Sequence, residues 1–356
     1  MKILHCPTDT GHQAFRLAQA ERALGCESDV VVYAKNYLGY ASDQVVFKTG
    51  QNKFSKLYSA AKFFTYAVHH YDVFHFNGGR SLIDHKYWHI HHWDLPLLKA
   101  LGKKIFMTYQ GCDARQKDIT KSRYTHAACH ECTQRACGPQ FDHWRRKRIN
   151  IVEHYADHIF VLNPDLLAFV VKATWLPYAG LDLKNIPQRT VSTATDLQPL
   201  HILHAPTNQS IKGTHYVVQA VTLLQKQGVP VELHLISGQT HDKVLAKIPT
   251  ADLVIDQLLI GFYGSFAIEA MAHEIPVMCY LREQDLLQCK ISYAGIPIIS
   301  VTPEQLADKI LYYSRNKPLL ADIGKQSRHY VEKIHDPLKV AEITTQLYKS
   351  SLSSTV

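Results

Sequence analysis

The sequence predicts an α/β protein made of two doubly wound, Rossmann-like domains. Strand-like runs and amphipathic helical segments alternate twice along the chain, over residues 1–183 and again over residues 200–334. Repeated strand–helix alternation favours parallel sheets with helices on both faces. Residues 184–199 lie between the two halves and are polar, proline-bearing and without periodicity, which is typical of a domain linker. Residues 335–356 form a last predicted helix.

The composition fits a globular protein with an anionic partner. The 356 residues are 46% hydrophobic and 20% charged, and the formal net charge is +8. Nucleotide diphosphates, an anionic membrane surface and nucleic acid all satisfy that charge. We expect a cytoplasmic protein, because no stretch of eighteen apolar residues occurs and the N-terminus enters a predicted strand at once.

The first half opens with a strand, a glycine turn, a helix and a second strand over residues 1–33. This turn lacks the three-glycine dinucleotide fingerprint, so a nicotinamide or flavin enzyme is not supported. Two later strands, residues 72–76 and 103–109, should open onto one crevice, because strand ends of a parallel sheet share an edge. The polar or glycine residues at these two ends are Asn77, Gly78, Gln110, Gly111, Asp113 and Arg115. A helix is expected from Asp165.

An aromatic stripe runs through residues 54–70 with lysines between its members. Its spacing is helical and favours packing into the core, and contact with a membrane is the alternative. The stripe consists of Phe54, Leu57, Tyr58, Ala61, Phe64 and Val68.

The segment of residues 117–148 is expected to be a cysteine-rich insertion in the first domain. Cys129, Cys132 and Cys137 could occupy three corners of a tetrahedral structural zinc site, with Cys112 or a histidine as the fourth ligand. The alternative is a set of free or adventitiously oxidised thiols. The segment ends in the basic run HWRRKR, which is either a solvated helix face or a contact for phospholipid headgroups or an anionic acceptor.

The second half carries the candidate nucleotide site. A strand at residues 200–206 leads through a short loop to Lys212 and Gly213 and then to a helix, which would place a cation beside helix N–H groups. Further on, a glycine turn precedes a helix expected to start at Phe266 and to be capped by Ser265. Glu269 is expected in the first turn, where it could accept two sugar hydroxyls of a nucleotide. The plain alternatives are a surface lysine and a solvated glutamate.

The run GFYGSFAIEAMAHEIPVMCY resembles the donor-site signature of retaining, family-four GT-B glycosyltransferases. In that family a glycine–aromatic–glycine turn leads into Glu-Ala-Met-Ala and Pro-Val, and Glu269 matches the second of two spaced glutamates. Gly261 stands where the first would be. The segment HAPTNQSIKGT is similar to the family's diphosphate loop, with Lys212 as the matching cation, Thr207 at the place of the usual arginine, and Asn208 as a substitute. Gln110 stands where a histidine is common.

The resemblance implies a GT-B architecture, with two domains facing across a cleft and the last helix crossing back to the first domain. It implies sugar transfer from a nucleoside diphosphate sugar to a hydroxyl of a glycan or lipid-linked acceptor, as in polysaccharide biosynthesis. The resemblance further implies that the sugar is transferred with retention of its anomeric configuration. No cofactor is expected to be required for catalysis, and the possible zinc at the cysteines would be structural. Catalytic roles fall on Lys212, Glu269 and Gln110, and donor binding on Thr207, Asn208, Lys212, Gly213, Gly264, Ser265, Phe266 and Glu269. The acceptor side of the cleft would be formed by Gly11, His12, Asn77, Gly78, Asp113 and Arg115.

Two other functions stay open at this point. A nucleotide-sugar epimerase or hydrolase on the same fold would fit the altered residues Gly261 and Gln110. A non-catalytic anion- or nucleic-acid-binding protein would fit the net charge, but a basic stripe with aromatic residues is missing and no nucleic acid is expected. Peripheral contact with the inner face of the cytoplasmic membrane is a further expectation.

Overall fold

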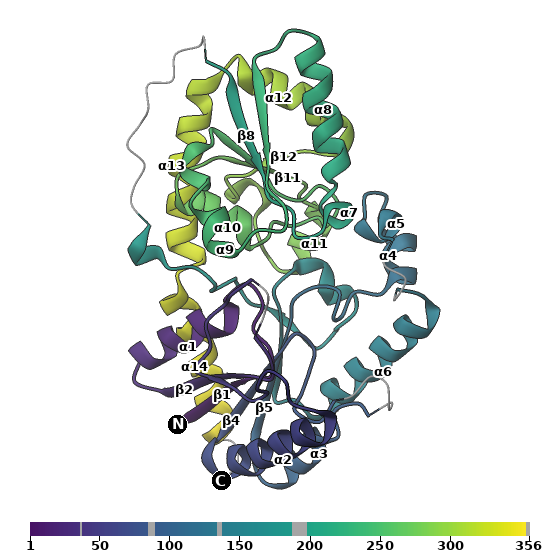
Figure 1. Cartoon of the computed structure of the whole chain (residues 1–356), viewed down its shortest axis with the longest axis vertical. Helices are drawn as coiled ribbons and strands as arrows, with labels where there is room; N and C mark the ends of the chain where they lie inside the picture. The colour runs from purple at the N-terminus through teal and green to yellow at the C-terminus, as the bar shows by residue number, and fades with distance from the viewer. Residues whose placement is uncertain (36–37, 85–89, 134–136, 187–197, 354–356) are drawn as a thin grey trace. The chain divides into compact units, whose positions relative to one another are not determined.

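The computed structural model describes residues 1–35, 38–84, 90–133, 137–186 and 198–353 and divides the chain into two compact units (Figure 1). The first unit comprises Met1–Gln116, Gly138–Leu181 and Asp336–Val356, and the second comprises Lys117–Cys137 and Asp182–His335. Most of the predicted linker, residues 187–197, lies outside the described residues. None of the described helices is both long enough and apolar enough to span a bilayer.

The first unit is built on a seven-stranded parallel sheet with the order β3-β2-β1-β4-β5-β6-β7. Helices α1 and α14 pack on each other, and α3 packs against α6 and β5. The chain leaves β1 to one side and returns beside it as β4, so the strand order reverses between β1 and β4. The elements are β1 Lys2–Cys6, α1 Gln13–Ala23, β2 Glu27–Val32, β3 Gln44–Val45, α2 Lys53–His70, β4 Val73–Asn77, α3 Asp94–Ala100, β5 Lys104–Tyr109, α6 Pro139–Tyr155, β6 His158–Val161, the 3₁₀ helix Pro164–Ala168, β7 Thr174–Trp175 and α14 Pro337–Ser353.

The final helix, α14, is held in the first unit by a buried polar network. The Oε1 atom of Glu21 accepts hydrogen bonds from the hydroxyls of Thr344 and Tyr348, each at 3.1 Å. Its Oε2 atom lies 2.8 Å from Nε2 of His5, and Tyr348 also contacts Nδ1 of His75 at 2.5 Å. All five side chains are buried. Buried polar groups of this kind need their partners, so the network fixes α14 against α1, β1 and β4.

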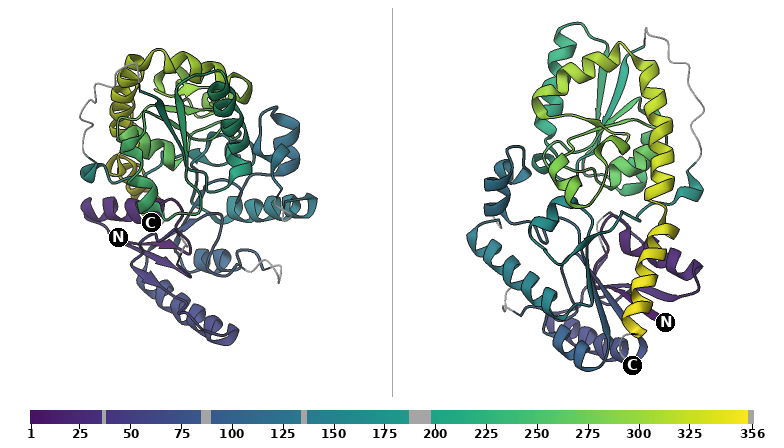
Figure 2. Two further views of the ribbon diagram at one scale, coloured as in Figure 1. Left: turned by 45° about the horizontal axis from the view of Figure 1, so that its top comes forward. Right: turned by 180° about the vertical axis from the view of Figure 1, so that it is seen from behind.

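Helix α2 corrects the expectation that its aromatic stripe enters the core. The residues of α2 that are buried are Phe63 and Ala67, whereas Phe54, Leu57 and Tyr58 are 84%, 61% and 70% exposed. Figure 2 shows this helix, in indigo, at the margin of the first unit. The stripe was placed one residue out of phase: a step of one residue turns a helix by about 100°, which carries the predicted face into solvent.

The second unit is built on a five-stranded parallel sheet with the order β12-β11-β10-β8-β9. A core of aliphatic residues joins β8, β9 and β10 to α8 and α12, and α10 packs against α13. The strand order reverses between β8 and β10. The elements are α4 Lys117–Arg123, α5 Ala128–Glu131, the 3₁₀ helix Leu183–Asn185, β8 Leu200–His204, α7 Gln209–Lys212, α8 Thr214–Lys226, β9 Val231–Leu235, α9 His241–Leu245, the 3₁₀ helix Ile248–Thr250, β10 Leu253–Ile255, α10 Ser265–Ala272, β11 Val277–Cys279, α11 Glu283–Gln288, the 3₁₀ helix Tyr293–Gly295, β12 Ile299–Ser300, the 3₁₀ helix Pro303–Gln305, α12 Leu306–Ser314 and α13 Lys317–Ile334.

The sequence suggested that the cysteine-rich insertion belongs to the first unit. In the structure, only part of it does. Residues Lys117–Cys137 join the second unit, whereas the rest of the insertion forms α6 in the first. The N–H of Ala128 donates to the carbonyl of Leu259 at 2.8 Å, and the Tyr124 hydroxyl donates to Asp285 at 2.9 Å. Ala128 is part of the aliphatic core of the second unit. These contacts explain why residues Lys117–Cys137 group with the second unit. No periodicity in the sequence of the insertion could reveal them.

Candidate functional site

A cation, a carboxylate and a helix N-terminus meet where the strand order of the second sheet reverses. The Nζ atom of Lys212 lies 2.5 Å from Oδ1 of Asp256, and the N–H of Gly264 donates to Oδ2 of Asp256 at 2.7 Å. Asp256 follows β10 and is 1% exposed, and Gly264 is the N-cap of α10. Ligands of open α/β sheets bind at such reversal points, beyond the carboxyl ends of the strands.

Gly264 allows Lys212 to come close to the start of α10. A Cβ atom at this position would lie 3.4 Å from both Nζ of Lys212 and Oδ2 of Asp256. Helix α10 begins at Ser265 and has no side-chain cap, which corrects the expectation that Ser265 caps a helix starting at Phe266. The first N–H groups of a helix carry a positive partial charge, so the uncapped start of α10 is suited to an anion.

Glu269 lies beyond the first turn of α10, which contains no acidic residue. Its Oε1 atom is 2.7 Å from Nε2 of His241, at the start of α9, and Glu269 itself is 6% exposed. The expectation of a first-turn carboxylate was wrong, because the helix begins one residue earlier than predicted. The pairing with His241 fixes the direction of the carboxylate, and no pattern in the sequence predicted this pairing.

The other residues predicted for donor binding have local roles. Asn208 caps α7, accepting the N–H of Ile211 at 3.1 Å, and Thr207 beside it is exposed. Gly213 joins α7 to α8 and has a φ of +74°, a backbone conformation that residues with a side chain rarely adopt. Lys212 is therefore the predicted loop residue whose charged group reaches the reversal point.

His204 lies beside this cluster as a buried neutral histidine. Its Nδ1 contacts the carbonyl of Ile255 at 2.8 Å and its Nε2 contacts the hydroxyl of Thr214 at 2.9 Å. Burial lowers the pKa of His204 to about 4, with the nearby Lys212 charge acting in the same direction. The ring therefore bridges β8, β10 and α8 without adding charge.

Gly261 stands where the resembling family has its first glutamate, and the structure supplies a physical reason. A Cβ atom here would lie 2.5 Å from Nη1 of Arg282, and Gly261 has φ +88°. The Arg282 guanidinium is already held by Asp285 at 2.6 Å and lies 3.6 Å from the centre of the Tyr124 ring. A glutamate at position 261 would require Arg282 to leave.

The first unit has its own cavity, of about 490 Å³, at the reversal point between β1 and β4. Two of the lining residues have a buried side-chain atom without a hydrogen-bond partner among the described residues, Oδ2 of Asp9 and Nε2 of Gln110. One is an acceptor and the other a donor. Burial raises the pKa of Asp9 to about 6. The wall consists of Thr8, Asp9, Thr10, Val32, Ala34, Tyr40, Ala41, Gly78, Arg80, Gln110, Gly111, Cys112 and Asp113.

Of the residues predicted for the acceptor side, Gly78 and Asp113 line this cavity, and so does Gln110, which was predicted to be catalytic. Asp113 accepts N–H groups from its own loop, including that of Gln110 at 2.9 Å, so it shapes the wall. The sequence missed Asp9, Thr8 and Arg80, although Asp9 follows β1 closely enough for the strand-end rule to have found it.

The remaining acceptor-side residues support the fold of the first unit. Arg115 forms a buried bidentate pair with Asp165, at 2.7 and 3.0 Å. Asn77 is 3% exposed and donates to the carbonyl of His75. Gly11 and His12 precede α1, and His12 accepts the N–H of Ala41 at 2.9 Å. The segment from Asp165 is a 3₁₀ helix, Pro164–Ala168, rather than the expected α-helix.

The basic run and the cysteines take different places from those expected. In HWRRKR, Arg145 pairs with Asp142, Arg146 with Gln116 and Arg148 with Asp84. Cys112 lies in the first unit, whereas Cys129, Cys132 and Cys137 lie in the second. In the described part of the chain, one group of three potential metal ligands comes together, and it contains none of these cysteines. Structural zinc at the cysteines stays a prediction.

No protein-family model and no curated protein matches this chain. Several solved structures are similar to it: sucrose-phosphate synthase from Thermosynechococcus elongatus, at 15% identity and a TM-score of 0.67, matches over 100% of both chains. Anabaena HepE in complex with UDP-glucose, at 13% identity and a TM-score of 0.59, covers 99% of this chain and 100% of its own. TarM, at 13% identity and a TM-score of 0.53, matches over 82% of this chain and 58% of its own chain. The chain therefore has the GT-B fold that these proteins share.

Proposed function

We propose that this protein is a glycosyltransferase that moves a sugar from a nucleoside diphosphate sugar to a hydroxyl of a glycan or lipid-linked acceptor. The observation that carries the proposal is the meeting of Lys212, Asp256 and the uncapped start of α10 at the reversal point of the second sheet. HepE, which shares the fold, has been crystallised with UDP-glucose and with UDP and glucose. A nucleotide at the corresponding end of this sheet would meet these groups.

Lys212 can serve a diphosphate while it remains bonded to Asp256. An ammonium group has three N–H donors, and Asp256 uses one of them. The Lys212 side chain is 15% exposed, so it is reachable from solvent. As the glycosidic bond breaks, negative charge grows on the departing diphosphate, and Lys212 and the N–H groups of Ser265 and Phe266 would stabilise it. This chemistry places no requirement on a metal ion.

The cavity of the first unit fits a hydroxyl-bearing acceptor. A sugar hydroxyl both donates and accepts hydrogen bonds, and the wall contains a carboxylate acceptor, Asp9, and a side-chain amide donor, Gln110. An apolar acceptor group would make no hydrogen bond to either residue.

We further propose transfer with retention. Retention is what the resemblance implied, and the structure adds Asp9, a carboxylate in the wall of the cavity. However, Oδ1 of Asp9 accepts the N–H of Ala14 at 3.0 Å, which ties the carboxylate to the start of α1. We assign Asp9 to hydroxyl binding rather than to activation of an inverting attack.

The proposal is tested by incubating the protein with UDP-, GDP-, ADP- and CMP-sugars, with and without acceptor glycans, and following the nucleotide released. Release that depends on the acceptor is expected, and NMR of the first-formed product should show the anomeric configuration of the donor. Free sugar or an epimer appearing without acceptor would instead identify the hydrolase or epimerase. An inverted product would assign Asp9 the role of general base.

A further inference from the structure

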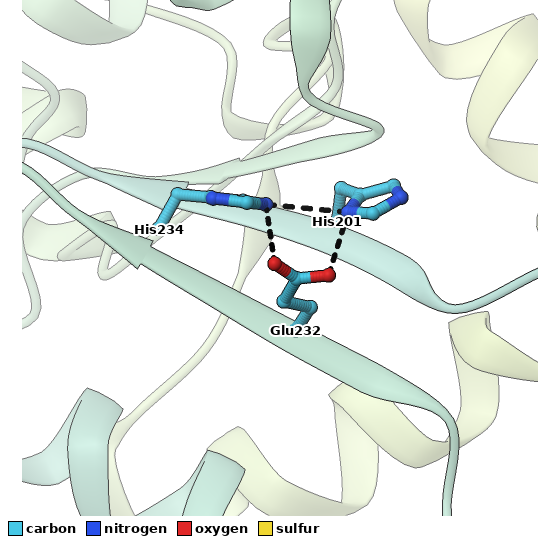
Figure 3. Close-up of side chains that lie close together, drawn as sticks. All are labelled: His201, Glu232 and His234. Atoms are coloured by element: carbon cyan, nitrogen blue, oxygen red, sulfur yellow. Dashed lines mark hydrogen bonds and ion pairs between the residues drawn. The ribbon is translucent and has the colours of Figure 1, made fainter.

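Two histidines and a glutamate converge on the open side of the second sheet (Figure 3). His201 lies on β8, and Glu232 and His234 lie on β9, the edge strand of the sheet. His201 is in register with Glu232, and His234 is two residues further along β9, so all three side chains point to one face. Leu200, Ile202 and Val231 point to the other face, into the core with α8.

The three side chains bring ligand atoms to one point. Nδ1 of His201 lies 3.2 Å from Nε2 of His234 and 3.4 Å from Oε2 of Glu232, and Nε2 of His234 lies 3.5 Å from Oε1 of Glu232. Hydrogen bonds alone do not account for this triangle. Each imidazole nitrogen has a single in-plane lone pair or N–H, so neither can bond to the other ring and to the carboxylate at once. A cation at the centre satisfies all three groups together.

The distances have the size that a tetrahedral metal requires. A zinc–nitrogen bond is about 2.05 Å long, so neighbouring ligand atoms in a tetrahedron are about 3.3 Å apart. The two ring nitrogens, Nδ1 of His201 and Nε2 of His234, are 3.2 Å apart, which is close to that value, and they lie 3.4 and 3.5 Å from different oxygens of the Glu232 carboxylate. The side chains of His201, Glu232 and His234 are 33%, 53% and 43% exposed, which gives a metal ion access from solvent and leaves room for water as a fourth ligand.

We propose that His201, Glu232 and His234 form a divalent metal site of the zinc class. Two imidazoles and one carboxylate suit zinc, nickel or copper better than magnesium or calcium, which prefer oxygen ligands. The site lies at the opposite end of β8 from the loop that leads to Lys212, so it is separate from the proposed diphosphate site. By joining the edge strand β9 to β8, the metal would stabilise the second unit and leave the sugar-transfer chemistry to other residues.

The test is a titration of the tag-free, metal-depleted protein with zinc, in competition with a chromophoric chelator. The wild type should bind one equivalent of zinc at this site, and the variants H234A and E232Q should lose it. Their affinity should fall more than about a hundredfold, since losing even an outer partner of a metal ligand costs roughly 10- to 100-fold. H329A, at an exposed histidine of α13, is the matched control and should bind like the wild type.

Cobalt separates this site from the cysteines. Cobalt bound by nitrogen and oxygen should give visible ligand-field bands that H234A and E232Q remove, without the near-ultraviolet charge-transfer band of a thiolate ligand. E232Q keeps the shape of the side chain, and circular dichroism checks that both variants fold. Unchanged zinc affinity in H234A and E232Q, or nitrogen–oxygen ligand-field bands of cobalt that persist in them, would overturn the proposal.

Discussion

Lys212 and Glu269 are assigned to different parts of one nucleotide. Lys212 should face the diphosphate, whose charge grows in the transition state, whereas Glu269, oriented by His241, should accept ribose hydroxyls that do not change during the reaction. K212A should therefore mostly lower kcat, by roughly a hundredfold or more. E269Q should mostly raise KM for the donor.

Steady-state kinetics with the preferred donor checks this division. K226A, at the exposed end of α8, is the matched control for loss of a lysine and should turn over like the wild type. A K212A variant with full kcat and full donor affinity would place the diphosphate elsewhere. The structure adds that D256N should also slow the reaction, because Asp256 orients Lys212.

His204 should make stability depend on pH. Its pKa is about 4 in the folded protein, so below the unfolded value of about 6.5 the unfolded chain binds a proton that the folded protein does not. This contribution to stability is complete above about pH 6.5 and is lost as the pH falls towards 4. Between pH 7.5 and 5.5, the loss of this contribution lowers the free energy of unfolding by about 1 kcal/mol.

Urea unfolding at these two pH values measures the effect. Buried His75 and His92, whose pKa values burial also lowers, act in the same direction, whereas Asp9, with its raised pKa, acts in the opposite one. The comparison of wild type with H204N isolates the one residue: H204N should be less stable at pH 7.5 and lose less stability at pH 5.5. An equal pH dependence in both proteins would mean that His204 is not buried and neutral.

The exposed face of α2 supports the expected membrane contact better than the arginine run that first suggested it. The arginines of HWRRKR are paired within their own unit, whereas Lys53, Lys56 and Lys62 are exposed on α2 beside Phe54, Leu57 and Tyr58. The helix contains no acidic residue. A basic face with exposed aromatic residues suits an anionic lipid surface.

The protein should therefore co-sediment with vesicles that contain anionic phospholipid, and high salt should release it from them. Each lysine removed from α2 should weaken binding about fivefold, because a lysine near an anionic surface contributes about 1 kcal/mol. F54A/L57A should also weaken binding, whereas L319A, at an exposed leucine of α13, should not. Equal binding by F54A/L57A and the wild type would show that α2 is not the contact.

The elements that could be predicted are those whose signal is local. Strand–glycine–helix alternation predicted the parallel strands, and the last helix, expected at residues 335–356, is α14. The face that α2 buries could not be predicted, because its sequence is apolar on more than one side and only tertiary packing decides which side is covered. The start of α10 shifted by one residue, and that shift alone moved Glu269 out of the first turn.

For the molecule as a whole, the sequence predicted the α/β class and the groups at the carboxyl ends of the strands, since both follow from chain order. It did not predict partners brought together by folding: Asp256 beside Lys212, His241 beside Glu269, or Tyr124 beneath Arg282. It also placed residues 117–137 with the wrong unit, because membership depends on contacts such as that of Ala128 with Leu259. Single residues in loops carry no periodicity that could reveal such pairs.

The central claim is that a nucleoside diphosphate binds where Lys212 meets the start of α10. Isothermal titration of the wild type, K212A and K226A with UDP, GDP and ADP tests it most directly. One of these nucleotides should bind the wild type and K226A alike, and K212A should bind it at least about tenfold more weakly, since a charged hydrogen bond is worth about 1.5–3 kcal/mol. Equal affinity of K212A and the wild type, or no binding of any nucleoside diphosphate, would contradict the assignment of this site.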